Sequence, residues 1–460
     1  MRITFSAAAE ASWPAVAGDY LQRGNGSVAV VESGADVLVS DDPARGSRHQ
    51  GADDRWVFTD AAGAALMHSA YVVDAVSRRT TVEVQLRAGD RVLAAGVTDV
   101  RRSVAATVDI ALRSAGPLIE MAVSGVVPVL PGGDRGPPEP VTAGAAARAA
   151  QWAFAGRVAR AAVTYRQWGV ARLPAGSVEA VATGNGSFER GSASTPLTWH
   201  SPPPNHFWAD PCVVAQHDQC WLFVEELDRS TGRGCIRALQ WDGGQLQPGP
   251  IVFATAHHLS FPQVQFVAGR WLATVETCAA ANPILTFDRL GDQWRIATDL
   301  PPLPPHMADP VIEFDGEGRP SLLTGTDAVT SPDAHYVEHT FGPDGWQRIP
   351  GATYVDVTSA RGGGSRSAGI RAVQDCAGVY GRALHLVPEV DWHGTRYGEP
   401  LMTLTGGDVS AQWQPAGVHT LTWTPDQEHV WIDGWRRRKS PLGGYRRLIE
   451  RRHLRECDHQ

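Results

Sequence analysis

The stretch Phe207-Trp208-Ala209-Asp210-Pro211-Cys212-Val213 returns twice, in altered form, in the second half of this 460-residue chain. The later copies read Leu259-Ser260-Phe261-Pro262-Gln263-Val264 and Met307-Ala308-Asp309-Pro310-Val311, and their prolines follow at steps of 51 and 48 residues. A second strand-like run comes shortly after each copy, the first being Cys220-Trp221-Leu222-Phe223-Val224. A period of this size, built from short apolar strands and tight turns, is typical of one four-stranded blade of a β-propeller.

Two weaker copies, Ala368-Gly369-Ile370-Arg371-Ala372-Val373 and Val418-His419-Thr420-Leu421-Thr422-Trp423, extend the count to five units. Tight turns inside the units are indicated by Asp242-Gly243-Gly244, Asp315-Gly316, Asp344-Gly345 and Asp433-Gly434. An irregular β-sandwich would also space its turns closely, but the return of one phrase favours the propeller. We therefore predict a mainly β fold with a five-bladed β-propeller over residues 165–436.

A smaller N-terminal α/β domain is predicted over residues 1–130. Thr80–Leu86 and Val92–Val97 alternate like strands, and Ser103–Val123 has helical spacing with Ser103 as the N-cap. Residues 131–164 are predicted as a linker and a connecting helix. The run Trp168-Gly169-Val170-Ala171 then begins the β-rich part, where we expect it to donate a strand that closes the last blade.

Composition narrows the class of protein. The net charge of −8 argues against a nucleic-acid partner. The six cysteines form no CxxC pair and no metal-binding spacing, so they are interpreted as thiols in a reducing compartment. The N-terminus lacks the apolar region of a secretory signal, and no uninterrupted apolar stretch is long enough to cross a membrane. These features predict a cytoplasmic protein.

The C-terminal segment 437–460 is predicted as a basic tail. Residues 435–460 contain nine Lys and Arg but only three acidic side chains, Glu450, Glu456 and Asp458. Such a tail can contact an anionic membrane surface or a phosphate-bearing substrate. A solvated basic helix is the simpler alternative.

Five short motifs between residues 165 and 436 resemble the N-terminal domain of plant glucosamine inositolphosphorylceramide transferases and their bacterial relatives. They are His258-Leu259-Ser260-Phe261-Pro262, Val275-Glu276-Thr277, Ala308-Asp309-Pro310, Arg366-Ser367-Ala368-Gly369 and Gln374-Asp375-Cys376-Ala377-Gly378-Val379-Tyr380-Gly381. The resemblance implies a five-bladed propeller of the kind shared by glycoside hydrolases of the arabinanase and invertase type. It also implies a preceding formyltransferase-like segment, and Thr81–Gly96 is similar to a strand and turn near the end of that fold. Because the catalytic Asn, His and Asp of that segment are not recognisable, we expect the N-terminal domain to be a scaffold.

The candidate catalytic residues are three carboxylates. Asp210, Ser260 and Asp309 are assigned equivalent places in the three copies, and Glu276 ends the second strand of unit two. The innermost strands of a propeller line its central funnel, where a pair of carboxyl groups can act as acid and base on a glycosidic bond. We predict Asp210 as base or nucleophile, Glu276 as acid and Asp309 as the group that orients the sugar or tunes the acid. The alternative for both aspartates is structural, because Asp before Pro commonly caps a turn.

Further side chains are predicted to bind the substrate: His258, Ser260, Glu226, Arg366, Gln374, Asp375 and Tyr380. Arg366 follows a glycine run and can pair with a ligand carboxylate or phosphate, or else with Asp375. His257 and His258 are adjacent and so face opposite sides of a strand, which argues against a shared metal site. We predict no metal and no cofactor.

The functional hypothesis is a carbohydrate-active enzyme that transfers or hydrolyses glycosyl groups in cell-surface glycan metabolism. Its partner would be a sugar or glycan, free or linked to a nucleotide or lipid. The alternative is a non-catalytic propeller that binds a glycan or a partner protein.

Overall fold

The structure is a computed structural model. It describes short strand segments up to residue 59, then residues 70–78, 80–125, 163–174, 197–277, 282–388 and 400–440, apart from a few single positions. The predicted linker and connecting helix lie outside the described residues up to position 162, and so does the basic tail from residue 441 onward. Those parts of the domain assignment remain predictions.

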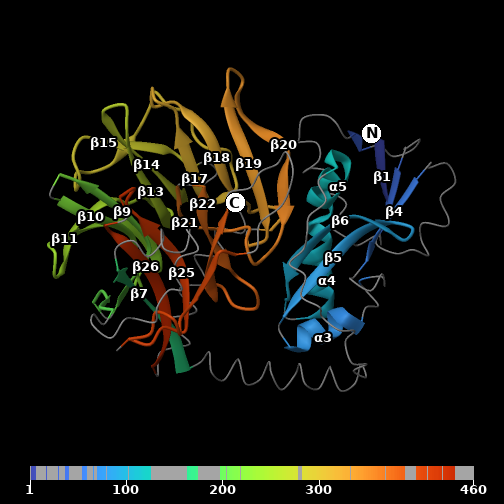
Figure 1. The fold of residues 1–460 in the computed structure, drawn as a ribbon, viewed down its shortest axis with the longest axis horizontal. Coiled ribbons are helices and arrows are strands. Elements are labelled where there is room, and N and C mark those ends of the chain that lie inside the picture. The colour runs from blue at the N-terminus through green and yellow to red at the C-terminus, as the bar shows by residue number, and fades with distance from the viewer. Residues whose placement is uncertain are drawn as a thin grey trace.

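Three four-stranded sheets and one eight-stranded sheet form a five-bladed propeller, which confirms the predicted fold class (Figure 1). The eight-stranded sheet contains blades four and five, which are joined by the parallel pairing of Gly364 with Leu421. Blade one contains β9 (His206–Gln216), β10 (Gln219–Asp228), β11 (Arg233–Trp241) and β12 (Leu246–Phe253). Blade two contains β13 (Leu259–Val267), β14 (Arg270–Thr277), β15 (Ile284–Phe287) and β16 (Arg295–Ile296). Blade three contains β17 (Met307–Phe314), β18 (Pro320–Asp327), β19 (His335–Gly342) and β20 (Gly345–Val355). Blade four contains β21 (Gly362–Ser367), β22 (Ile370–Asp375), β23 (Ala383–Pro388) and β24 (Met402–Thr405).

Blade five is assembled from two distant parts of the chain. It contains β25 (Gly417–Trp423) and β26 (Val430–Lys439), followed by β7 (Thr164–Leu173) and β8 (Trp199–His200). The pairing of β26 with β7 is antiparallel and runs from Val430 opposite Leu173 to Lys439 opposite Thr164. The predicted closing strand is thus confirmed, and the first three residues assigned to the basic tail belong to β26 instead. Hydrogen bonds between the two ends of the propeller close the ring.

The innermost strands of blades one to three share a bulge. The residue before each proline, Asp210, Phe261 and Asp309, has a positive φ of 49°, 47° and 46°, which is uncommon for residues other than glycine. The pairing register with the second strand shifts at the same place in all three blades. Equating Ser260 with the two aspartates was therefore wrong by one residue, because the proline and not the serine fixes the register. Blade two places an aromatic ring where its neighbours place a carboxylate.

One predicted copy and one predicted turn differ from the structure. The copy Ala368–Val373 does not open blade four, which begins with the glycine run of β21, and Gly369, with a φ of 73°, turns the chain into the second strand β22. Asp433-Gly434 lies inside β26 and makes no turn. A Cβ at Gly434 would lie 2.8 Å from both the Gly417 carbonyl oxygen and the Trp199 ring, so this glycine serves close packing. The other three Asp-Gly pairs do lie between strands.

Close approach of backbones at the blade four and five junction gives a first testable prediction. Gly364 has a φ of 113°, and a Cβ there would lie 2.3 Å from the Leu421 carbonyl oxygen of β25. We expect Gly364→Ala to lower the free energy of unfolding by about 1–3 kcal/mol, measured by denaturant titration. The matched control is Gly316→Ala, because nothing lies within 4 Å of a Cβ at that position. Equal stability of the two variants would contradict this explanation of the glycine run.

The N-terminal domain contains one six-stranded sheet and three described helices. The sheet order is β2 (Ala29–Val30), β1 (Arg2–Ser6), β3 (Val37–Ser40), β4 (Asp54–Thr59), β5 (Thr81–Ala88) and β6 (Arg91–Asp99). The helices are α3 (Ala70–Arg78), α4 (Val104–Arg113) and α5 (Ala115–Ser124). Ser103 caps α4 as predicted, by accepting a hydrogen bond from the Ala106 amide. The single predicted helix is two helices, since Pro117 has no amide hydrogen for the Arg113 carbonyl.

The N-terminal domain packs against blade three, where α5 lies beside β20 (Figure 1). One apolar core spans the junction: Leu118 and Ile119 of α5 share it with Tyr354 and Val355 of β20. Glu120 of α5 also pairs with Arg348 of β20 at 2.8 Å. The two domains therefore bury a common interface.

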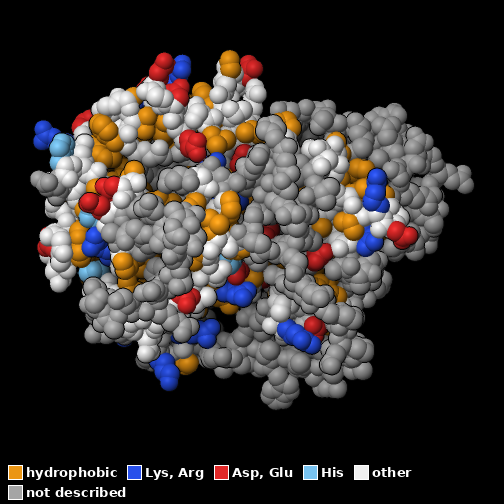
Figure 2. All heavy atoms as spheres, viewed as in Figure 1, with side chains coloured by type: hydrophobic (Ala, Val, Ile, Leu, Met, Phe, Trp, Pro, Cys, Tyr) orange, Lys and Arg blue, Asp and Glu red, His pale blue; other side chains and the backbone are white. Residues whose placement is uncertain are grey.

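The described surface carries charges of both signs. On the face drawn in Figure 2, acidic and basic side chains are interspersed over the propeller. None of the described helices has the length and apolar character needed to cross a lipid bilayer.

Candidate functional site

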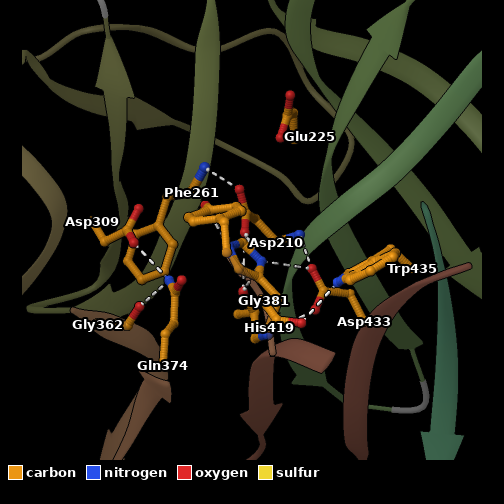
Figure 3. A network of polar contacts seen from close by, with 12 residues as sticks. Asp210, Glu225, Phe261, Asp309, Gly362, Gln374, Gly381, His419, Asp433 and Trp435 are labelled. Carbon is orange, nitrogen blue, oxygen red and sulfur yellow. Dashed lines mark hydrogen bonds and ion pairs between the residues drawn. The ribbon is translucent and has the colours of Figure 1, made fainter. Parts of the chain in front are cut away.

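A protonated histidine joins two buried aspartates at the centre of the propeller. His419 lies on β25, Asp210 on β9 and Asp433 on β26. The His419 Nδ1 atom is 3.1 Å from Asp210 Oδ1 and 3.1 Å from Asp433 Oδ2 (Figure 3). Burial alone would lower the pKa of His419, but the carboxylates of Asp433 and Asp210 raise it to about 10. The imidazole is therefore positively charged at neutral pH.

Hydrogen bonds around this histidine connect four strands, β9, β13, β25 and β26. Asp433 accepts from the backbone amides of Asp210, at 2.9 Å, and Thr420, at 2.7 Å. Asp210 accepts from the Phe261 amide at 3.2 Å and from the Thr420 hydroxyl at 3.0 Å. Burial would raise the pKa of Asp210, but the charge and hydrogen bond of His419 outweigh it and lower this pKa. Asp210 is thus an ionised carboxylate held in place from three sides.

Asp210, His419 and Asp433 could also hold a metal ion, since their ligand atoms all lie within 4.8 Å of one another. Two carboxylates and an imidazole are an acceptable ligand set for several divalent metals. An ion at this place would have to displace the proton from His419 Nδ1, because a metal ligand must be unprotonated. The raised pKa of His419 makes that displacement costly at neutral pH.

A second polar group lies around Asp309 of β17. The Arg361 guanidinium binds the Asp309 carboxylate through Nε at 2.5 Å and through Nη2 at 3.3 Å. Gln374 of β22 donates to Asp309 Oδ2 at 2.7 Å and to the Gly362 carbonyl at 2.5 Å (Figure 3). Arg361 also donates to Asp333 at 2.9 Å. This arginine therefore holds two carboxylates at once.

Glu276 of β14 adjoins the Asp309 group. Its Oε2 atom accepts a hydrogen bond from the Asp309 amide at 2.8 Å and lies 3.9 Å from Arg361 Nη2. Burial and the negative charge of Asp309 raise the pKa of Glu276 well above its usual value, against the opposing effect of Arg361. The Glu276 side chain keeps 22% of its surface exposed, whereas that of Asp309 keeps 3%. Glu276 is thus the more accessible of the two carboxyl groups, and its raised pKa favours the acid form.

Tyr380 connects the two groups. Its hydroxyl lies 2.5 Å from His419 Nε2, and the Arg361 guanidinium lies 4.9 Å above its ring. Burial raises the pKa of Tyr380 well above its usual value, and the charges of Asp309 and Asp210 add to the rise. Because protonated His419 donates to the Tyr380 oxygen, the phenol proton remains available for a ligand. We call these residues the axial cluster: Asp210, Glu276, Asp309, Arg361, Gln374, Tyr380, His419 and Asp433.

Glu225 and His258 form a pair next to this cluster. His258 Nε2 lies 3.3 Å from Glu225 Oε1, and His258 Nδ1 accepts from the Gly234 amide at 2.9 Å. Burial raises the pKa of Glu225. The hydrogen bond and charge of Glu225 raise the pKa of His258, although burial opposes them. Glu225 is drawn above Asp210 in Figure 3, and the negative charge of Asp210 adds to the raised pKa of both Glu225 and His258.

The remaining predicted residues lie in different places. Ser260 is directly opposite Glu276 in the β13–β14 register, so both side chains share one face of the blade. Glu226 is next to Glu225 on β10 and therefore faces the other way, where it accepts from Arg237 and from the Trp208 indole. Asp375 accepts from the Ala377 amide and lies 3.5 Å from Arg382.

Arg366 pairs with Glu313 rather than with Asp375. Its Nε atom lies 3.3 Å from Glu313 Oε1 on the inner strand of blade three. The predicted contact of Arg366 with a ligand stays a prediction. Arg361, at the other end of the same glycine run, is the arginine that reaches the carboxylates.

Sequence reasoning missed Arg361, His419 and Asp433. Arg361 directly precedes the glycine run that drew attention to Arg366. His419 lies inside the fifth copy of the repeated phrase, but that copy was used only to count units. Asp433 was interpreted as a turn residue because Asp-Gly is typical of hairpin turns. Glycine also occurs inside strands where another backbone packs closely, and the dipeptide alone does not distinguish the two cases.

Comparison with known proteins yields similar folds but no family. The sequence matches no family model and no curated protein. Among solved structures, the chain is similar to an exo-β-1,3-galactanase from Clostridium thermocellum, with 9% identity, a TM-score of 0.35, and coverage of 49% of this chain and 58% of that one. It is also similar to an arabinanase from Bacillus subtilis, with 12% identity, a TM-score of 0.30, and coverage of 49% and 93%. A third is a GH43 enzyme from Xanthomonas citri complexed with xylotriose, with 12% identity, a TM-score of 0.36, and coverage of 58% and 93%.

These structural neighbours are carbohydrate-active glycoside hydrolases. The chain spans little more than half of the galactanase. The predicted membership of the glucosamine inositolphosphorylceramide transferase family and the formyltransferase-like segment remain predictions.

Proposed function

We propose that the axial cluster binds a glycan and hydrolyses a glycosidic bond, with Glu276 as general acid and Asp210 as general base. The observation that carries the proposal is that the pKa of one carboxyl group is raised and that of another lowered within one cluster. Glycoside hydrolysis needs such a pair, because one group must give a proton to the leaving oxygen while the other activates water. Asp309 supports the acid by keeping its pKa high.

Binding of a sugar has its own support. Tyr380 offers a phenol proton, while its ring is packed against Arg361 and His419. The raised pKa of Glu276 favours its acid form, which adds a donor to sugar hydroxyls. Ser260 shares the face of Glu276 and can add a hydroxyl contact. Asp210 accepts from the Phe261 amide, the Thr420 hydroxyl and His419. A carboxylate has about four acceptor sites, so one remains for the water that Asp210 would activate.

Glycosyl transfer in cell-surface glycan metabolism would use the same acid and base, with an acceptor hydroxyl in place of water. A nucleotide- or lipid-linked donor would bring phosphates that need cations. Arg361, the arginine among the carboxylates, is committed to Asp309 and Asp333. This favours hydrolysis of an uncharged glycan over transfer from a phosphate-linked donor. A cytoplasmic location and contact of the basic tail with membranes remain parts of the hypothesis.

The proposal is tested by incubating the full-length protein with neutral oligosaccharides, among them xylotriose and α-1,5-arabino-oligosaccharides, and measuring new reducing ends. If the wild type produces new reducing ends and Asp210→Asn does not, the result supports hydrolysis. Binding by saturation-transfer NMR without release would identify a non-catalytic glycan-binding propeller instead. If the protein neither binds nor cleaves any oligosaccharide of the panel, both the hydrolase proposal and the glycan-binding alternative are wrong.

A further inference from the structure

The N-terminal domain reaches the axial cluster through the last strand of its sheet. The Val97 carbonyl of β6 accepts a hydrogen bond from the Val357 amide at 2.9 Å. Two residues further on, the Asp99 carboxylate accepts from the Gly378 amide at 2.9 Å. Both contacts are made by the C-terminal end of β6, so this end of the strand holds two different propeller loops.

Those two loops carry two members of the axial cluster. The loop after β20 leads from Val357 to Arg361, and the loop after β22 leads from Gly378 to Tyr380. The loops are also tied to each other, since the Val357 carbonyl accepts from the Cys376 amide at 3.0 Å and the Arg361 carbonyl accepts from the Gln374 amide at 2.9 Å. A displacement of β6 must therefore move both Arg361 and Tyr380.

The junction is closely packed and carries charge. A Cβ at Gly96 of β6 would lie 2.7 Å from the Val355 Cβ, so the two backbones meet with no spare room. Burial raises the pKa of Asp99, and the negative charge of Asp333 adds to the rise while the Gly378 amide opposes it. Asp333 is itself bonded to Arg361, so Asp99 influences the cluster electrostatically as well as through the loop.

We propose that Asp99 is a positioning residue of the axial cluster, and that the N-terminal domain completes the site by fixing the loops of Tyr380 and Arg361. The domain is then more than the inert scaffold expected from its sequence. The geometric part of this inference is independent of the proposed hydrolysis, whereas its effect on turnover rests on that function.

Hydrogen–deuterium exchange of the full-length protein tests the geometric part without any ligand. In Asp99→Ala we expect the segment 375–382 to exchange about tenfold faster, because one hydrogen bond to a charged acceptor is lost. Peptides from β10 of blade one should be unchanged. Asp99→Asn keeps an oxygen acceptor for the Gly378 amide and should restore protection to within about twofold. Asp90→Ala, in the exposed turn between β5 and β6, is the matched control and should behave as wild type.

Unchanged exchange of 375–382 in Asp99→Ala would overturn the proposal, and so would faster exchange spread evenly over all blades, since that reports global destabilisation. If an oligosaccharide is hydrolysed, Asp99→Ala should also lower kcat/KM about tenfold with rescue by Asp99→Asn. Loss of activity in every variant together with wild-type exchange would count against the proposal as well. If the protein hydrolyses no oligosaccharide but shows the predicted exchange pattern, the proposed function is wrong and the positioning role of Asp99 is supported.

Discussion

Replacing His419 with Gln should be the most destabilising single change considered, lowering the free energy of unfolding by about 3–5 kcal/mol. His419 supplies the positive charge between the buried carboxylates of Asp210 and Asp433. A neutral side chain leaves two buried carboxyl groups facing each other without a cation, and burial already raises the pKa of Asp433. Denaturant unfolding at pH 7 measures the effect, and His257→Gln, an exposed histidine of the neighbouring segment, is the matched control.

The pH dependence of stability separates this explanation from a loss of packing. The pKa of His419 is raised from 6.5 to about 10, so its contribution is fully present below about pH 6.5 and is lost as the pH rises toward 10. The wild type should therefore lose stability over this interval, and His419→Gln should lose much less. If both proteins show the same slope between pH 6.5 and 10, the histidine is not the titrating group.

Replacing Glu276 with Gln should reduce the rate of glycoside hydrolysis by about 10²–10⁴-fold, with little change in the melting temperature. Glutamine preserves the shape of the side chain and still accepts from the Asp309 amide through its carbonyl oxygen. It cannot transfer a proton to the leaving oxygen. Glu317→Gln is the control, because that glutamate is exposed in the turn between β17 and β18.

The pH–rate profile should identify the same residue. Since the acid form of Glu276 is the active one and its pKa is raised, activity should fall as the pH rises through that pKa. The pKa of Asp210 is lowered, so activity should persist toward acid pH until this base is protonated. An aryl glycoside with a good leaving group needs less acid assistance, and Glu276→Gln should recover part of its rate on it. An equal deficit on good and poor leaving groups would exclude the acid role.

The sequence determined the blades because their signals are local. The proline phrase, the apolar runs and three of the four Asp-Gly turns each lie within one blade, so period and turn chemistry sufficed to predict five units and the strand that closes the ring. Local signals also explain the errors. Ser260 and Phe261 differ by one position. The proline that follows Phe261 marks it as the counterpart of Asp210, and the positive φ and the register shift in blade two agree.

The tertiary structure alone decided how the candidate site is built. Asp210 is hydrogen-bonded to Thr420, 210 positions later in the chain, and Asp309 is hydrogen-bonded to Gln374, 65 positions later. No local pattern encodes such partners, because closure of the propeller brings them together. The same is true of β6, whose Asp99 meets a loop 279 residues away. Sequence could propose which carboxylates matter, but their charge states follow from burial and from the cations of other blades, which exist only in the folded chain.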